Sequence, residues 1–434
     1  MNEMFEDLRE HRHIICIDLM SFYASVECVE RGLDAKKVML VVADVERGEG
    51  SVTLAATPPA KKAGLSSRGR LYEIDPKLRK ELIIVKPSMQ KYVDYSLKIN
   101  SIYRTLFDDE DMYVYSIDET FIDITNYLTL YNTTPEKMAL AIKRKIFREL
   151  GLHVTIGYGP NMVLSKFALD IESKHTPNQI AIWTYENFTE KLWPITDFTK
   201  VWGIGQGRAR TLRKMGITSM GELAKFPLEV INKKMGVIGE ELVLHANGID
   251  LSRVQDGHQL EGHKSLGVGQ TLQDDRFDDE LLNIIIEMIF DTVLKLRNYE
   301  YKCSGIALSL GFNKKFYKGG VHKSLKLGAP TSDYNYIKDE FTNVFNEIYP
   351  RGIGVRKISI SLTGLSDNQY EQMDLFNKNA PKRANLDEAL LKIRSKYGKS
   401  SVMTANSKFK NATGYERNQL IGGHNAVAKS KLEE

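Results

Sequence analysis

Ile14-Ile15-Cys16-Ile17-Asp18 is an apolar, β-prone run that ends in a carboxylate, and Val114-Tyr115-Ser116-Ile117-Asp118-Glu119 repeats this pattern later in the chain. Carboxylates brought together at strand ends repel one another unless protons or divalent cations neutralise them. Three such oxygen ligands suit Mg²⁺, which keeps waters and substrate phosphates in its other positions, so the pattern favours phosphoryl or nucleotidyl transfer. The alternative for either run alone is an ordinary turn acid, because Asp is common in turns.

Composition narrows the class of protein. The chain has 434 residues, which exceeds one ordinary core and predicts about three or four domains. Its hydrophobic (42%) and charged (27%) contents are typical of a soluble globular protein. No apolar stretch approaches the ~20 residues of a membrane span, and Glu3, Glu6 and Asp7 do not fit a signal peptide, so we expect a cytoplasmic protein. The cysteines lack paired metal-ligand spacing and are expected to be reduced structural thiols: Cys16, Cys28 and Cys303.

The first part of the chain predicts a ferredoxin-like βαββαβ unit. Once residues 38–86 are set aside as an insertion, we expect strands at 13–18, 113–118, 121–125 and 153–158, with helices at 22–31, 88–107 and 134–150. Thr134 begins the last helix and Gly151 ends it. In this fold the first and third strands are antiparallel neighbours, so Asp18 is expected beside the hairpin that carries Asp118 and Glu119.

A second βαββαβ order is predicted near the other end, with strands at 264–271, 302–312, 320–327 and 355–363 and helices at 278–298 and 332–348. No acidic pair stands at its strand ends. Its middle strands and their connection instead carry lysines that favour contact with a phosphate backbone: Lys314, Lys315, Lys318, Lys323 and Lys326. A solvated hairpin is the alternative.

A glycine turn opens a basic helix between the two units. Gly203-Ile204-Gly205 precedes Arg208, Arg210 and Arg213, which is typical of a helix-hairpin-helix element. Backbone N–H groups at such a turn can hold a phosphate without reading sequence. We therefore expect Gly203, Gly205 and Arg208 to contact a DNA backbone, and a plain turn is the alternative.

Two motifs resemble the catalytic motifs of Y-family translesion DNA polymerases: Asp18-Leu19-Met20-Ser21-Phe22-Tyr23-Ala24-Ser25-Val26-Glu27 and Tyr115-Ser116-Ile117-Asp118-Glu119-Thr120-Phe121. The resemblance covers roughly residues 10–425 and is closest to the UmuC-like branch, the ImpB/MucB/SamB family. It implies an α+β multidomain right-hand polymerase with a ferredoxin-like palm, small fingers, a helical thumb and a βαββαβ little finger. The implied boundaries are palm 1–21 and 87–173, fingers 22–86, thumb 174–250, linker 251–263, little finger 264–366 and C-terminal tail 367–434.

The resemblance also implies an activity. The enzyme would be a DNA-directed DNA polymerase that performs error-prone translesion synthesis in the SOS response to DNA damage. Asp18, Asp118 and Glu119 would hold two Mg²⁺ ions, with the backbone carbonyl of Leu19 as a further ligand. These ions would activate the primer 3′-hydroxyl, orient the dNTP and stabilise the pyrophosphate leaving group.

Nucleotide-binding residues are implied around these acids. Tyr23, next to Phe22, matches the ring that stacks under the incoming sugar and excludes a 2′-hydroxyl, although both aromatics could simply pack the start of a helix. Lys61 and Lys166 match phosphate contacts, and an exposed helical lysine is the alternative for Lys166. Pro58 and Lys61 stand where better-known members have Tyr and Arg, and lysine lacks the bidentate fork of arginine.

The C-terminal region suggests protein partners. Gln372-Met373-Asp374-Leu375-Phe376 resembles the bacterial sliding-clamp peptide, in which Gln hydrogen-bonds while Leu and Phe fill an apolar pocket; a local contact with the little finger is the alternative. UmuC-like members also commonly require a UmuD-like accessory protein and a recombinase filament. Residues 377–434 carry 12 Lys/Arg against 5 Asp/Glu, and a partner surface, further DNA contact and disorder are all open for them.

Two other functions fit part of the pattern. A nucleotidyl cyclase uses the same palm and acids, but it leaves the glycine turn, the basic second unit and the clamp-like peptide unexplained. A clamp-tethered DNA-binding scaffold with a decayed site is the non-enzymatic alternative. The presence of all three acids and Tyr23 argues against that decay.

Overall fold

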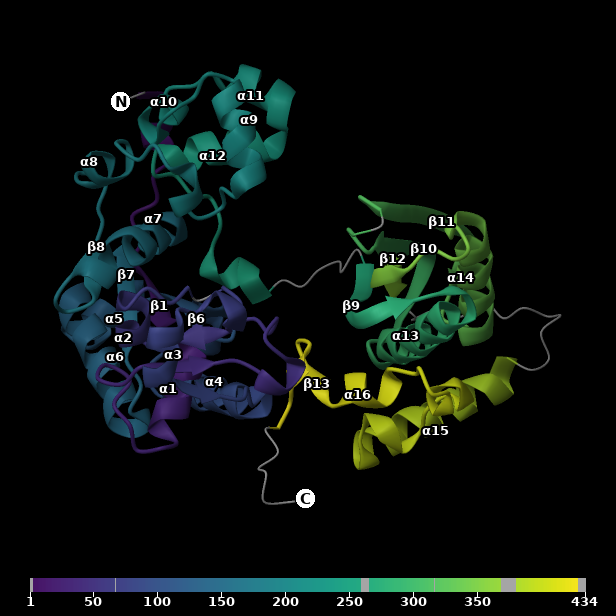
Figure 1. Ribbon diagram of the computed structural model, residues 1–434. Helices are drawn as coiled ribbons and strands as arrows, with labels where there is room; N and C mark the ends of the chain where they lie inside the picture. The colour runs from purple at the N-terminus through teal and green to yellow at the C-terminus, as the bar shows by residue number, and fades with distance from the viewer. Residues whose placement is uncertain (1–2, 67, 259–264, 316, 368–379, 428–434) are drawn as a thin grey trace. The chain divides into compact units, whose positions relative to one another are not determined.

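The computed structural model describes residues 3–66, 68–258, 265–315, 317–367 and 380–427. The chain divides into two compact units, Met1–Gln259 with Val427–Glu434, and Leu260–Ala426 (Figure 1). Across the described ranges, no helix is both long and apolar enough to cross a membrane. All three cysteines are buried and free, as expected for structural thiols.

A five-stranded sheet forms the centre of the first unit. Its order is β5-β6-β1-β7-β8, built from β5 (Met112–Val114), β6 (Glu119–Asp123), β1 (Ile14–Leu19), β7 (Val154–Gly159) and β8 (Ile180–Ile182). β1 pairs antiparallel with both β6 and β7, which confirms the predicted ferredoxin-like order. β8 is not among the predicted strands; it pairs parallel with β7 and widens the sheet.

The helices beside this sheet include α1 (Phe22–Val29), α4 (Met89–Arg104), α5 (Thr125–Leu130) and α6 (Pro135–Leu150). Three of them, α1, α4 and α6, follow the predicted order, whereas the short α5 was not predicted and begins at the residue where the predicted strand 121–125 ends. Thr134 caps α6 by accepting the Lys137 N–H, and Gly151 ends it in the left-handed conformation with a φ of 67°. The bounds of α6 therefore agree with the prediction.

Residues 38–86 fold into a small sheet with a core of its own. β2 (Leu40–Val42) pairs antiparallel with β3 (Ala55–Ala56) and parallel with β4 (Ile83–Val85). α2 (Pro58–Lys62) and α3 (Pro76–Glu81) complete the segment. Its core is separate from the palm core and includes Val41, Ala56, Ala60 and Leu71.

A helix lies unusually close to β7. α7 (Met162–Phe167) continues into a π-helical turn, η5 (Ala168–Glu172), and both contact β7. Gly157 and Gly159 permit this approach, because a Cβ atom on Gly157 would lie 2.1 Å from the Ser165 carbonyl oxygen. The polar residues of α7 and η5 are thereby held next to the strand that neighbours β1.

The remaining helices of the first unit lie in residues 174–250, the predicted thumb. They are α8 (Phe188–Leu192), α9 (Gln206–Lys214), α10 (Met220–Ala224), α11 (Leu228–Met235) and α12 (Val237–Ala246). Their apolar residues share one core with α7, which includes Phe167, Trp183 and Phe188. The thumb helices are thus packed on the same helix that lies on β7.

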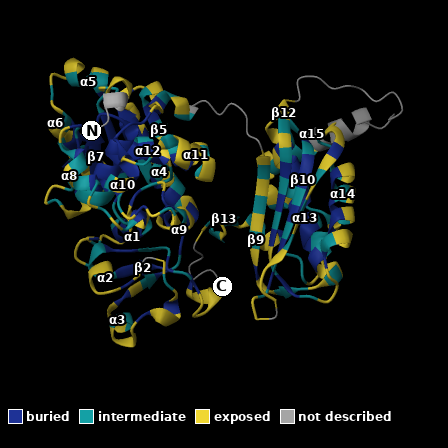
Figure 2. Ribbon diagram, turned by 90° about the horizontal axis from the view of Figure 1, so that it is seen from above, coloured by how far each residue is buried: buried dark blue, intermediate teal, exposed yellow. Residues whose placement is uncertain are grey.

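The second unit repeats the element order but not the sheet order of the palm. Its strands run β11-β10-β12-β9, with β9 (Ser265–Arg276), β10 (Tyr301–Phe312), β11 (Gly320–Thr331) and β12 (Val355–Asp367). α13 (Asp278–Asn298), whose bounds agree with the prediction, and α14 (Tyr334–Ile348) cover one face (Figure 2). The first strand therefore lies at an edge here, whereas the first strand of the palm is interior.

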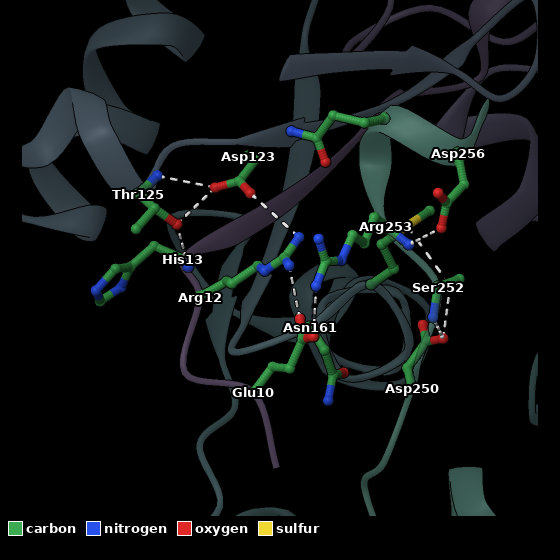
Figure 3. Close-up of polar contacts among 12 residues, drawn as sticks. Glu10, Arg12, His13, Asp123, Thr125, Asn161, Asp250, Ser252, Arg253 and Asp256 are labelled. Carbon is green, nitrogen blue, oxygen red and sulfur yellow. Dashed lines mark hydrogen bonds and ion pairs between the residues drawn. The ribbon is translucent and has the colours of Figure 1, made fainter. Parts of the chain in front are cut away.

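The chain that leaves the thumb packs against the first unit. Val254 in η8 (Val254–His258) is fully buried. Figure 3 shows Arg12 and Arg253 reaching the same carboxylate, with Arg12 Nη2 at 2.8 Å and Arg253 Nη2 at 3.4 Å from Glu10. Asp250 accepts the backbone N–H of Val163 at 3.0 Å. Residues at the start of the predicted linker 251–263 therefore pack against the first unit.

Candidate active site

Strand pairing places the three predicted acids at adjacent backbone positions. Asp18 on β1 is the register partner of Glu119 on β6, and the Leu19 N–H donates to the Asp118 carbonyl at 3.0 Å. The Ser116 hydroxyl donates to Asp118 Oδ1 at 2.7 Å. The strand order thus brings the two acidic runs together in the way that the sequence predicts.

Lysine side chains lie against these acids. Lys166 Nζ is 2.6 Å from Glu119 Oε1, and Lys174 Nζ is 3.7 Å from Asp18 Oδ2. Asp170 on η5 bridges the two lysines, at 3.0 Å from Lys166 and 3.5 Å from Lys174. Over the described part of the chain, no three His, Cys, Asp or Glu side chains are grouped so that they could hold a metal. Glu119 and Asp18 are instead paired with Lys166 and Lys174.

The donor set nevertheless fits Mg²⁺ by its chemistry. Three carboxylates and the backbone carbonyl of Leu19 supply hard oxygen atoms, which this ion prefers. Burial raises the pKa of Asp18 to about 6; the Lys174 ammonium opposes this shift, and the Asp118 carboxylate reinforces it. A divalent cation among these acids would favour their ionised forms, because opposite charge stabilises a carboxylate.

The structure favours Lys174 over Lys166 as the exposed cation of the site. The Lys166 side chain is 7% exposed and enclosed by two carboxylates, so its position does not support the predicted phosphate contact. The Lys174 side chain is 47% exposed. Sequence reasoning missed Lys174, because the π-helical turn of η5 sets which lysine projects past the acids, and no residue pattern signals that turn.

Lys61 reaches the same region from the fingers. Its Nζ donates to the Ser21 hydroxyl at 2.9 Å. Burial lowers the pKa of Lys61, the nearby Lys174 ammonium lowers it further, and Asp18 opposes both. Two lysines from separate elements therefore lie near Asp18, where a polyphosphate could pair with them.

A strained turn positions the aromatic pair. Ser21 has a left-handed φ of 49°, which turns the chain from β1 directly into α1, and such strain is concentrated at functional sites. Phe22 is 3% exposed, so the predicted nucleotide contact is not supported for this ring. The ring of the partly exposed Tyr23 stacks on Tyr92 with 4.3 Å between centroids. The Tyr92 hydroxyl in turn donates to the buried Glu27 at 2.8 Å.

The predicted glycine turn is exposed and precedes α9. Gly203 has a φ of 85°, which favours glycine, and Gly205 is the N-cap residue of α9. Arg208 donates to the Gly203 carbonyl and so holds the turn. The Trp202 indole N–H donates to the Tyr115 hydroxyl at 3.2 Å, which joins the turn to the palm hairpin.

The lysines of the second unit divide between two faces. Lys314 and Lys315 are exposed in the connection between β10 and β11. Lys323 lies on the helix-covered side and pairs with Glu347 of α14, so its position does not support a contact through the open face. Lys326 and Lys357 instead lie on the open face, opposite Gly305 and Gly311 of β10. The clamp-like peptide, with Gln372, Met373, Leu375 and Phe376, falls outside the described residues.

A palm sheet with paired acids and a second βαββαβ unit defines a polymerase of the right-hand class. A solved Y-family DNA polymerase chimera has this fold, with a TM-score of 0.64 over 82% of this chain and 100% of that chain, at 22% identity. The impB/mucB/samB family model matches residues 17–170, and the model of the impB/mucB/samB family C-terminal domain matches residues 263–375. The chain belongs to this family of Y-family DNA polymerases.

Curated relatives cover nearly the whole chain. UvrX of Bacillus subtilis (strain 168), named as a UV-damage repair protein, is 37% identical over 95% of this chain and 97% of its own length. DNA polymerase IV 2 of the same organism is 33% identical over 96% of this chain and 100% of its own length. DNA polymerase IV 2 of Halalkalibacterium halodurans is 30% identical over 95% of this chain. These matches confirm the predicted family and enzyme class.

Proposed function

We propose that this polymerase performs error-prone translesion synthesis in the SOS response, adding dNTPs to a DNA primer with two Mg²⁺ ions at Asp18, Asp118 and Glu119. The observation that supports this function best is the β1–β6 register, which sets Asp18 opposite Glu119. The names of UvrX and DNA polymerase IV 2 agree with a role in DNA repair. The proposed setting is the cytoplasm, with primer–template DNA as the bound partner.

Neighbouring side chains orient the carboxylates that would serve nucleotidyl transfer. The two ions, when bound, would lower the pKa of the primer 3′-hydroxyl and neutralise charge on the triphosphate. Lys166 and the Cys16 thiol both contact Oε1 of Glu119, at 2.6 and 3.1 Å, so they orient this carboxylate. Ser116 orients Asp118 in the same way. The primer oxygen attacks the α-phosphate as pyrophosphate leaves, and positioning and charge compensation supply most of the catalysis.

Primer extension on an undamaged and an abasic template, with Mg²⁺, tests the proposal. We expect product on both templates, and more when the sliding clamp, a UmuD-like accessory protein and a recombinase filament are present. Absence of product under every condition, with intact DNA binding, would favour the DNA-binding scaffold. A nucleotidyl cyclase would instead form a cyclic nucleotide from a nucleoside triphosphate without DNA.

Replacing Lys174 by alanine is expected to raise the KM for dNTP about tenfold or more and to change kcat less. The half-exposed ammonium near Asp18 would lose a charge-assisted contact with the triphosphate, which is worth about 1.5–3 kcal/mol. Single-nucleotide insertion kinetics measure both constants. Lys174→Arg should restore part of the effect, and Lys77→Ala on the exposed surface of α3 is the matched control. An unchanged KM in Lys174→Ala would remove this residue from the phosphate site.

Deleting Leu375 and Phe376 is expected to cut clamp-stimulated synthesis while sparing synthesis without the clamp. These two side chains are the proposed apolar anchors, and buried anchors carry most of the binding energy in such interfaces. Extension reactions with and without the bacterial sliding clamp separate the two activities. An equal loss of both would indicate a structural role for the peptide.

A further inference from the structure

The C-terminal segment is a folded part of the second unit. α15 (Ala380–Tyr397), η9 (Lys399–Ser401), η10 (Ala405–Lys408) and α16 (Gly414–Asn418) follow one another, and α15, η10 and α16 contact α13 (Figure 1). We call residues 389–426 the docked tail. Both family models end by residue 375, so the docked tail lies beyond what they match.

Acidic and amide side chains on one stripe of α13 hold the docked tail. The contacts are Glu280 with Asn411, Asn283 with Asn406, Glu287 with the backbone of Thr413 and Gly414, and Asp291 with Arg394 and Arg417. Steps of three and four residues lie on one helix face. Glu287 is 3% exposed and accepts two backbone N–H groups at 3.0 Å each, so the attachment is specific.

Docking leaves lysine as the exposed basic residue of the tail. Between residues 389 and 427 the sequence has seven Lys or Arg residues and one acidic residue, Glu416. Arg394 and Arg417 form ion pairs with Asp291, at 2.8 Å and 2.6 Å. Lys399, Lys408 and Lys410 are exposed. The outward surface of the docked tail is therefore positively charged.

Three aromatic rings stand out among these lysines. Tyr397, Phe409 and Tyr415 are 66%, 58% and 59% exposed, although large aromatic side chains usually bury most of their surface. Lys408 and Lys410 flank Phe409 in the sequence, and α16, which carries Tyr415, contacts η9 next to Tyr397. Lysines interleaved with exposed rings are typical of surfaces on which bases stack while the cations follow the phosphates.

We call Tyr397, Phe409 and Tyr415, with the lysines between them, the aromatic strip. This strip runs along α13. The segment with Phe409 is attached near Glu280, and Tyr397 and Tyr415 belong to elements attached near Asp291, a separation of about 16 Å at 1.5 Å per residue. Thr413 also contacts Gln270, which shares its side of β9 with the buried Leu272. The strip thus lies on the helix-covered side of the unit and is separate from the open sheet face with Lys326 and Lys357.

We propose that the docked tail binds single-stranded DNA through Tyr397, Phe409 and Tyr415 and the lysines between them. Unpaired bases expose the faces that stack on such rings, whereas a duplex hides them. This site goes beyond the polymerase activity and does not depend on it. A protein partner is the competing occupant, and the charge of the strip argues for a polyanion.

Binding of labelled oligo(dT) to the full chain, first saturated with unlabelled primer–template duplex, tests the proposal. The saturated protein is expected to bind oligo(dT), and Tyr397→Ala/Phe409→Ala/Tyr415→Ala is expected to lose at least about tenfold in this affinity. Lys408→Ala/Lys410→Ala should lower the slope of log affinity against log salt by about 1.4. Affinity for duplex DNA should stay within about twofold. The strip is separate from the open sheet face with Lys326, where contact with the duplex backbone is predicted.

Matched controls come from the first unit. Tyr72→Ala removes an exposed aromatic, and Lys77→Ala/Lys80→Ala removes two exposed lysines of α3. Neither should change oligo(dT) affinity. The proposal is overturned if the tail variants, with unchanged melting temperatures, bind oligo(dT) normally or lose duplex and oligo(dT) affinity in parallel. Normal oligo(dT) binding with loss of an accessory protein would assign the strip to a protein partner.

Discussion

Replacing Asp118 or Glu119 by alanine is expected to abolish primer extension while leaving affinity for primer–template DNA nearly unchanged. Each substitution removes a carboxylate that the β1–β6 pairing sets beside Asp18. Loss of several kcal/mol of charge stabilisation corresponds to a rate decrease on the order of a thousandfold or more. Gel-based extension with Mg²⁺ measures the rate, and a fluorescence binding assay without dNTP measures DNA affinity.

The controls separate chemistry from folding. Asp118→Asn keeps the shape and the Ser116 contact but removes the charge, so we expect it to be nearly as inactive as Asp118→Ala. Glu110→Ala changes an exposed acid before the same hairpin and should retain activity. Full synthesis by either alanine variant of the two site acids would refute the assignment, and parallel loss of DNA binding would point to misfolding.

Replacing Tyr23 by alanine is expected to increase ribonucleotide incorporation relative to deoxyribonucleotide incorporation. Tyr92 lies against one face of the Tyr23 ring at 4.3 Å, and Phe22 packs nearby, so the ring cannot readily move away from a 2′-hydroxyl. Loss of such a steric contact is worth about 10–200-fold in selectivity. The ratio of kcat/KM for each ribonucleotide and its deoxyribonucleotide measures this change.

Tyr23→Phe is the matched control because it keeps the ring and its stacking but removes the hydroxyl. Selectivity should remain near that of the unsubstituted enzyme. If Tyr23→Ala shows the same ratio as Tyr23→Phe, the ring is only a packing residue at the start of α1. A second control, Tyr127→Ala, removes a partly exposed aromatic of α5 and should leave the ratio unchanged.

Much of the fold could be read from the sequence because local signals and strand order agreed. Thr134 and Gly151 mark the ends of α6 through capping, and the predicted bounds of α13 match the structure. The meeting of Asp18 with Asp118 and Glu119 followed from the βαββαβ order, since that order makes the first and third strands neighbours.

The features that the sequence does not signal depend on geometry beyond one element. Lys166 and Lys174 lie on either side of a π-helical turn; the first is enclosed and the second is half exposed. Lys323 and Lys326 lie on opposite faces of the sheet, because side chains three residues apart on a strand point to opposite sides. The sequence prediction grouped these lysines without using that alternation. The docking of the tail on Glu287 and Asp291 depends on long-range pairs that carry no local pattern.

The different strand orders of the two units bear on the origin of the chain. An internal duplication of one βαββαβ unit would retain its connectivity, yet β1 is interior in the palm and β9 is an edge strand. An acid placed at the end of β9 would face β12, because these two strands are paired, and not the β10–β11 hairpin. The two units therefore share the order of helices and strands along the chain but not the order of strands in the sheet. Point substitutions in the second unit could not create a centre like that of Asp18, Asp118 and Glu119, in which the first strand lies beside the hairpin.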